Sequence, residues 1–173
     1  MDSISDLEFG RAAEHLVVAD LILSGHRAYL TEQGLPYDIV IDRNGRLLRV
    51  QVKASRGAKR LPGRAVGMGY LYHVRRAGKR GKRQYASSEF DIIALVAMDV
   101  RVIAYLPLSD RVLQTIYLRP PGYQHHARAE RRHAIDQFPI EAALAALTGT
   151  APVLPHWPRT VHVQHQGVLF EVA

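Results

Sequence analysis

The sequence lacks several features that mark secreted, metal–thiolate or membrane proteins. It contains no cysteine, which excludes a disulfide framework and any thiolate metal site. No apolar run approaches the roughly 18 residues that a membrane span needs. The first residues, Met1–Asp6, lack the basic start and apolar stretch of a signal peptide. We therefore expect a cytoplasmic protein with no membrane partner.

Acidic residues are also absent from one long stretch of the chain, between Arg56 and Arg83. The same stretch holds ten basic residues, which is more than the net charge of +7 of the whole chain. A block of like charge repels itself unless a polyanion neutralises it, and a nucleic-acid backbone is the usual partner. The alternative is a solvated basic loop that serves solubility. The many glycines of the stretch favour a loop that moulds itself to a phosphate backbone.

Length and element order predict one α/β domain over residues 1–150, followed by a Pro-rich linker and a C-terminal arm over residues 151–173. A chain of 173 residues is long enough for one domain with an apolar core. The expected order is a helix, three strands, a strand pair and further helices. That order predicts a mixed sheet flanked by helices. The basic stretch, residues 56–84, enters this plan as an insert that we expect to be mobile without DNA.

The expected elements follow from periodicity and from cap and turn residues. Ser5 and Glu8 form a capping box for a helix over Ser5–Ser24. Alternation with a period of two predicts strands over Tyr37–Arg43 and Arg46–Ala54. The other expected elements are strands at Arg27–Leu30, Tyr70–Val74, Asp91–Met98 and Arg101–Leu106, helices at Ser109–Ile116 and Pro139–Leu147, a linker at Ala151–Pro158 and a hairpin at Thr160–Val172.

A two-residue turn at Asn44–Gly45 fixes the register of the first hairpin. That register places Asp38 directly opposite Gln51, and directly opposed Cβ atoms are ~5 Å apart. Lys53 lies two residues further along the same face, diagonal to Asp38. A carboxylate, an amide and an ammonium are thereby gathered on one face. The alternative is an ordinary half-exposed hairpin with an Asp–Lys pair.

Glu14 brings a second carboxylate from the expected helix. It shares a helix face with Val17 and Leu21, which should pack on the sheet. A buried carboxylate without a partner is costly, so this position needs a cation or a metal ion nearby. The alternative is a glutamate at the edge of the apolar stripe whose carboxylate reaches water along its stem.

Three runs of the sequence together resemble the PD-(D/E)XK nuclease superfamily. They are Gly10–Glu14, Pro36–Asp38 and Gln51–Ser55. Gln51 stands where the superfamily usually has an acid. This substitution, with Tyr85 and Glu89–Asp91 later in the chain, resembles the branch that includes group-I-intron homing endonucleases. The resemblance spans roughly Asp6 to Leu106 and implies a restriction-endonuclease-like fold.

By this resemblance, Glu14, Asp38, Gln51 and Lys53 form a catalytic centre. Asp38 would be the principal ligand of Mg²⁺, or of Mn²⁺, and would bridge it to the scissile phosphate. Gln51 and the Val52 carbonyl would complete the metal site, with Glu14 bound directly or through water. Lys53 would stabilise the pentacovalent phosphate or orient the attacking water. Gln51 removes one negative charge but keeps an oxygen ligand for a hard ion.

We therefore predict a Mg²⁺-dependent endonuclease that hydrolyses DNA phosphodiester bonds. Because cutting both strands usually needs two active sites, we expect a homo-oligomer, a dimer or a tetramer. The alternative is a non-catalytic nucleic-acid-binding module on a nuclease fold, for which Gln51 is the best argument. The residues expected to contact DNA are Ser55, Arg56, Lys59, Arg60, Arg75, Arg76, Lys79, Arg80, Lys82 and Arg83.

Overall fold

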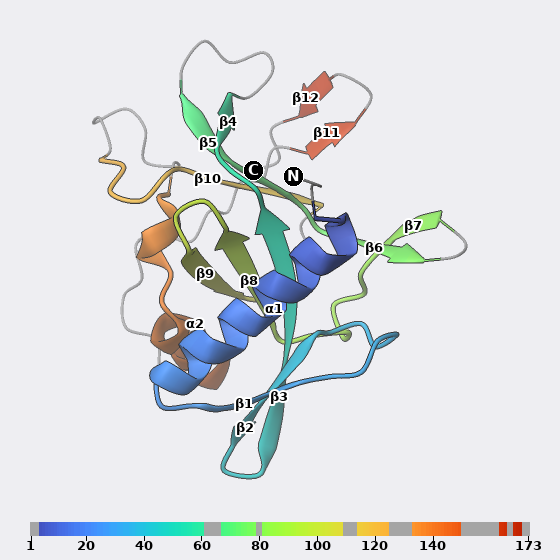
Figure 1. Ribbon diagram of the computed structural model, residues 1–173, viewed down its shortest axis with the longest axis vertical. Coiled ribbons are helices and arrows are strands. Elements are labelled where there is room, and N and C mark those ends of the chain that lie inside the picture. The colour runs from blue at the N-terminus through green and yellow to red at the C-terminus, as the bar shows by residue number, and fades with distance from the viewer. Residues whose placement is uncertain are drawn as a thin grey trace.

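The computed structural model describes residues 4–60, 67–78, 81–108, 114–124, 133–149, 163–165 and 168–170. At its centre is a five-stranded sheet in the order β1-β2-β3-β8-β9 (Figure 1). β3 and β8 run parallel and the other neighbours run antiparallel, so the predicted α/β fold with a mixed sheet is confirmed. The five strands are β1 (Arg27–Leu30), β2 (Ile39–Arg43), β3 (Arg46–Ser55), β8 (Ile92–Ala97) and β9 (Val102–Pro107).

Two helices cover one face of this sheet. In α1 (Asp6–Leu23) the predicted capping box is present, since the Ser5 hydroxyl accepts the Glu8 N–H and the Glu8 carboxylate accepts the Ser5 N–H. Figure 1 shows α1 crossing in front of the central strands. The apolar side chains of α1 pack with those of the sheet and of α2 (Ile140–Thr148) in one buried cluster. The helical members of this cluster are Ala13, Val17, Leu21, Ile140, Ala143 and Leu144.

The opposite face of the sheet is also covered. A smaller sheet in the order β10-β5-β4 packs there together with the 3₁₀ helix η1 (Ile135–Gln137). Ile93 and Leu95 of β8 share a buried cluster with two tyrosines of β5. Because both faces are covered, the central strands are buried on both sides, as β3–β8 parallel pairing usually requires. The smaller sheet comprises β4 (Lys59–Arg60), β5 (Met68–His73) and β10 (Thr115–Leu118).

Two hairpins lie beside these layers. β6 (Arg75–Gly78) and β7 (Gly81–Gln84) form a two-stranded ribbon that projects from the body of the molecule (Figure 1). β11 (Val163–His165) pairs antiparallel with β12 (Val168–Phe170), which confirms a C-terminal hairpin for these residues. The predicted linker, Ala151–Pro158, lies outside the described residues, so the division of the chain at residue 150 stays a prediction.

One predicted element is wrong where the structure describes it. The helix expected over Ser109–Ile116 ends in a strand, since Thr115 and Ile116 belong to β10 and pair with His73 and Tyr72 of β5. Residues 109–113 lie outside the described residues. β-Branched side chains fit a pleated surface, and pairing with β5 buries Ile116 in the second cluster. Neither described helix has the length and apolarity needed to cross a membrane.

Candidate active site

The β2–β3 hairpin has the register that its turn predicts. The turn residues Asn44–Gly45 both have positive φ, 54° and 84°, as a two-residue hairpin turn of type I′ requires. At the far end of the ladder Ile39 pairs with Val50. Asp38 lies one residue before β2, and its N–H donates to the Val50 carbonyl at 2.9 Å. Asp38 therefore reaches the neighbourhood of Gln51, as predicted, although β2 begins two residues later than expected.

The Asp38 carboxylate is bonded directly to the middle of β3. Its Oδ2 accepts the Val52 N–H at 2.7 Å and also accepts a short hydrogen bond from the Gln51 amide. The Gln51 Nε2 donates in addition to the Val52 carbonyl at 3.0 Å, and only 4% of Gln51 is exposed. Burial raises the pKa of Asp38, and the Val52 N–H and the Lys53 ammonium offset this in part.

Lys53, two residues after Gln51 on β3, points toward the same site as Asp38 and Gln51. Its ammonium donates to the Tyr85 hydroxyl at 3.2 Å and lies 5.3 Å from the centroid of the Tyr85 ring. Burial lowers the pKa of Lys53, whereas the carboxylates of Asp38 and Glu14 act in the opposite direction. Burial also raises the pKa of Tyr85 to about 12, with a further contribution from Asp38. The Tyr85 hydroxyl therefore stays protonated near neutral pH.

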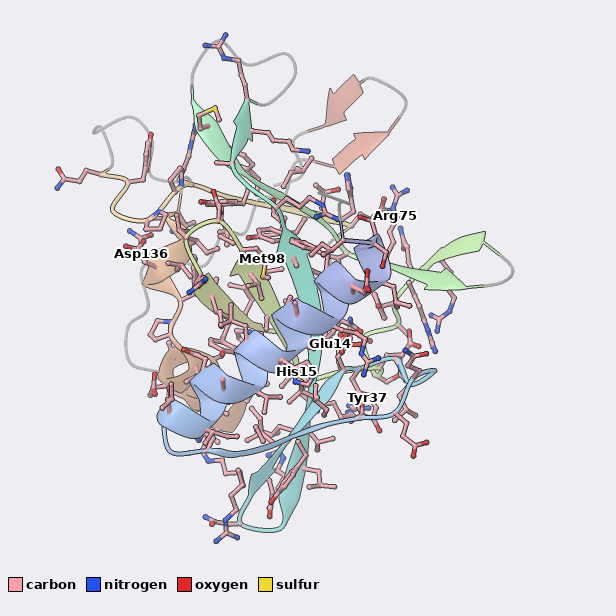
Figure 2. All side chains as sticks on the ribbon, viewed as in Figure 1. Glu14, His15, Tyr37, Arg75, Met98 and Asp136 are labelled. Carbon is pink, nitrogen blue, oxygen red and sulfur yellow. The ribbon has the colours of Figure 1, made fainter. Side chains whose placement is uncertain are left out.

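Glu14 approaches this group from the helix. It is half-buried, and burial raises the pKa of its carboxyl. The Asp38 carboxylate raises the pKa of Glu14 further, against the lowering effects of Arg11 and Lys53. Figure 2 shows Glu14 midway along α1, with Tyr37, the neighbour of Asp38, on the loop below it. Two carboxylates, an amide and an ammonium thus surround the part of the β3 edge that β2 leaves unpaired, beyond the pairing of Ile39 with Val50.

This arrangement fits the comparison with known protein families. A sequence model described as PD-(D/E)XK endonuclease matches residues 5–138. The chain belongs to the PD-(D/E)XK endonuclease family.

A solved structure supports the same fold. The bacterial homing endonuclease I-Ssp6803I matches with a TM-score of 0.56 and 21% sequence identity. The match covers 73% of this chain and 86% of that one. The search of curated proteins found no match. The restriction-endonuclease-like fold expected of this chain is therefore confirmed.

The donor set of this PD-(D/E)XK site suits a hard divalent cation. All four candidate ligand groups offer oxygen: the carboxylates of Asp38 and Glu14, the Gln51 amide and the Val52 carbonyl. The two carboxylates repel each other in a half-buried place, which a cation would relieve. The Gln51 amide now donates from nitrogen, so it must turn over to present Oε1 to a cation. Among the described residues no group of three or more His, Cys, Asp or Glu gathers, so this mixed set is the candidate.

The structure places Arg56, the first of the expected DNA-contacting arginines, against the start of α1. Its guanidinium pairs with the Asp6 carboxylate at 2.9 Å and lies 4.2 Å from the centroid of the Phe9 ring. Ser55, at the end of β3, donates to the Gly57 carbonyl at 3.2 Å. These contacts engage both side chains within the protein.

Two arginines of the β6–β7 ribbon are also engaged. Arg76 and Arg83 are partners across the ribbon, and both approach the Glu89 carboxylate. Arg83 donates to it at 2.8 Å, and Arg76 lies 3.5 Å from it. Arg76 also donates a short hydrogen bond to the Gly34 carbonyl, in the loop that leads to Asp38. These two side chains anchor the root of the ribbon to the body.

Of the remaining basic residues expected to contact DNA, three that the structure describes are exposed. Lys59 and Arg60 are exposed on β4, and Arg75 is exposed on β6. Lys82 lies on β7, opposite Ala77. Lys79 and Arg80 lie outside the described residues. The DNA-contacting role of the whole set stays a prediction.

Sequence reasoning did not place Tyr85 in the site. Its hydroxyl contacts the Lys53 ammonium, and the two residues are far apart in the chain. The signal that could have found it is the run from Tyr85 to Asp91, which entered only through the family resemblance. Asp91, the last residue of this run, forms two hydrogen bonds of 3.0 Å with the Arg49 side chain, which tie β3 to the start of β8.

Proposed function

We propose that this protein is a Mg²⁺-dependent endonuclease that hydrolyses DNA phosphodiester bonds, with Mn²⁺ as an alternative cofactor. The observation that carries the proposal is the gathering of Glu14, Asp38, Gln51 and Lys53 at the free edge of β3. A binding module has no need of two mutually repelling carboxylates beside a half-buried lysine. Family membership as a PD-(D/E)XK endonuclease supports the nuclease class.

Each residue has a role that follows from its chemistry. Asp38, Gln51, the Val52 carbonyl and Glu14 would hold the cation, since all of them offer oxygen. Bound there, a divalent cation neutralises charge that develops on the phosphate and makes water nucleophilic at neutral pH. The Lys53 ammonium would donate to a phosphate oxygen, and its buried surroundings strengthen that interaction.

DNA is the proposed substrate because exposed basic side chains flank the site on the segment between β3 and β8. Arg75 is exposed on the ribbon, and Figure 2 places it above the region of Glu14 and Tyr37. A backbone lying across the site would meet these charges and release its counterions. We further propose a cytoplasmic homo-oligomer, a dimer or a tetramer, because a single small site cuts one strand at a time.

The experiment is nicking of supercoiled plasmid by purified protein, with Mg²⁺ or Mn²⁺ against EDTA, at low salt. Lys53→Ala and Asp38→Ala are compared with Asp42→Asn, which changes an acid on the same hairpin and keeps a group that can accept the Gly45 N–H. Metal-dependent nicking that both alanine variants lose and Asp42→Asn retains supports the proposal. Equal nicking in all four proteins contradicts it.

Gln51, which stands where the family usually has an acid, favours one other candidate function, that of a non-catalytic nucleic-acid-binding module. The Gln51 amide donates to both Asp38 and the Val52 carbonyl, two of the groups that a cation would need. DNA binding by gel shift without any nicking, on plasmids and on a randomised duplex library, would favour this second candidate.

A further inference from the structure

The second strand of the ribbon leads directly to the candidate catalytic lysine. β7 ends at Gln84, and the next residue, Tyr85, turns inward, with 7% of its surface exposed. Its ring packs edge-on against Phe90 at 5.2 Å between centroids. Its hydroxyl accepts a hydrogen bond from the Lys53 ammonium at 3.2 Å. Both the ring and the hydroxyl therefore restrict where the lysine can point.

The backbone on both sides of Tyr85 is held by Glu89. The Glu89 carboxylate accepts the Ala86 N–H at 2.7 Å, and the Glu89 N–H donates to the Ala86 carbonyl at 3.1 Å. The same carboxylate binds Arg83, whose guanidinium also donates to the Gln84 carbonyl at 2.9 Å. Tyr85 is thus presented from a short segment that is fixed before and after it.

Lysine needs such support more than most side chains. Its ammonium lies on a flexible four-carbon stem, and holding it in one place costs side-chain entropy. A single hydrogen bond to a rigid phenol fixes the direction of the ammonium, while two donor hydrogens remain for a phosphate oxygen or a water. Neutral tyrosine provides this contact without adding a charge beside the carboxylates.

We propose that Tyr85 is a positioning residue for Lys53, acting through the hydrogen bond between its hydroxyl and the lysine ammonium. The inference rests on the proposed nuclease function of Lys53. By this proposal the ribbon also has a second role, because its strand β7, which carries basic side chains, determines the position of Tyr85.

The test is Tyr85→Phe, which removes one hydroxyl and keeps the ring packed on Phe90. The matched control is Tyr72→Phe, since Tyr72 is also buried and its hydroxyl has no hydrogen-bond partner among the described residues. Two properties are measured in each protein. The first is the rate at which an amine-acylating reagent labels Lys53 without metal or DNA, read by mass spectrometry. The second is the single-turnover rate of plasmid nicking at saturating enzyme.

In Tyr85→Phe we expect Lys53 to be labelled faster and nicking to slow by about 10- to 100-fold. The enzyme concentration that gives half of the maximal nicking rate should be unchanged. Tyr72→Phe should match the wild-type protein in both measurements. Slower nicking with unchanged labelling would overturn the proposal, since Tyr85 would then act on the substrate itself. Where the wild-type protein nicks DNA, unchanged nicking with faster labelling would also overturn it.

The labelling measurement keeps the two proposals separate. If the wild-type protein nicks no DNA, the proposed function fails on its own experiment. Faster labelling of Lys53 in Tyr85→Phe would then still support the positioning contact, and labelling equal to that of Tyr72→Phe would refute it. Thermal denaturation of both variants checks that the ring substitution leaves the fold intact.

Discussion

The carboxylate of Asp38 accepts the backbone N–H of Val52 at 2.7 Å, so the residue just before β2 is fastened to the middle of β3 by its side chain. The strand ladder has already ended at Ile39. This bond continues it by one step and sets the carboxylate beside the Val52 carbonyl and the Gln51 amide. The hydrogen bond made by Asp38 can therefore be tested separately from its proposed role in metal binding, because an asparagine amide could also accept the Val52 N–H.

Asp38→Asn should therefore keep the fold and lose the activity. The asparagine oxygen can accept the Val52 N–H, but the negative charge that holds the cation is gone. We expect nicking to fall by at least about 100-fold and the midpoint of thermal unfolding to change little. Binding of Mn²⁺, measured by the relaxation of water protons, should weaken in parallel. Wild-type nicking by Asp38→Asn would remove Asp38 from the site.

Glu14→Gln should raise the stability of the metal-free protein. Burial and Asp38 raise the pKa of Glu14 above its ordinary value of 4.5, so the folded state disfavours the ionised carboxyl. This destabilisation of the folded state is absent at pH values below the ordinary pKa of Glu14. It develops as the pH rises from the ordinary pKa to the raised pKa of the folded state, and it persists at higher pH. The variant should be more stable by about 1 kcal/mol near neutral pH, and the gain should vanish on acidification below 4.5.

Urea denaturation of Glu14→Gln at several pH values checks this expectation. Glu141→Gln, a change to an exposed acid in the first turn of α2, is the control and should give no gain. Adding Mn²⁺ should stabilise the wild-type protein more than Glu14→Gln, because a ligand that binds only the folded state raises its stability. A Glu14→Gln protein that is less stable than wild type would show that the carboxylate is satisfied without metal.

Glu89→Gln should tighten non-specific binding of DNA. Hydrogen bonds from Arg83 lower the pKa of Glu89 to about 2, so the carboxylate is ionised at neutral pH and holds Arg83 and Arg76. Removing its charge releases two guanidinium groups for phosphate. The salt dependence of log K should steepen by up to about 0.9 for each further phosphate that these arginines neutralise. The measurement is fluorescence anisotropy of a labelled duplex in EDTA over a range of salt.

The control for this prediction is Glu32→Gln, which removes the same charge from an exposed position. It should strengthen binding slightly through net charge and leave the salt slope unchanged. If both variants behave alike, Arg76 and Arg83 do not reach DNA and act only as anchors of the ribbon.

Asp91→Ala should loosen the junction of β3 and β8. Asp91 accepts the Arg49 N–H at 2.7 Å and its guanidinium at two further positions. Burial alone would raise the pKa of Asp91, but the hydrogen bonds from Arg49 outweigh it and lower the pKa. We expect a loss of about 2 kcal/mol in the free energy of unfolding at neutral pH.

Because the pKa of Asp91 is lowered, its contribution is present above the ordinary value of 3.8 and is lost as pH falls below that value. The difference between wild type and Asp91→Ala in urea denaturation should therefore shrink at acid pH. Asp91→Asn, which keeps an acceptor for Arg49, should lose less. A difference that does not change with pH would point to lost packing instead of lost charge.

Local signals were enough to predict the part of the site that lies on the first hairpin. The Asn44–Gly45 turn fixes a register, and alternation then decides which side chains share a face. The Ser5–Glu8 capping box placed the start of α1 in the same way. Each of these signals acts between residues that are close in the chain, and the structure agrees with them.

Contacts between distant residues could not be read from the chain in this way. The basic character of Arg56 and Arg83 predicts DNA contacts, which stay a prediction, but it did not indicate that Asp6 and Glu89 bind these side chains in the folded protein. The link between Lys53 and Tyr85 needs the ribbon to return the chain to β3. The strand β10 was missed because its pairing with β5, a contact between distant residues, decides between a strand and a helix there.

The direct pairing of β3 with β8 means that the chain leaves the central sheet after Ser55 and re-enters it at the adjacent position. This excursion, the segment between β3 and β8, can become longer, shorter or differently charged without moving the strand that bears Gln51 and Lys53. Within the part of the excursion that the structure describes, the return segment from Tyr85 to Asp91 is the one that side-chain hydrogen bonds tie to Lys53 and Arg49 of that strand. A designer could therefore exchange the ribbon for one with another preference in DNA, provided that this short return segment and the Arg83 that binds Glu89 are left as they are.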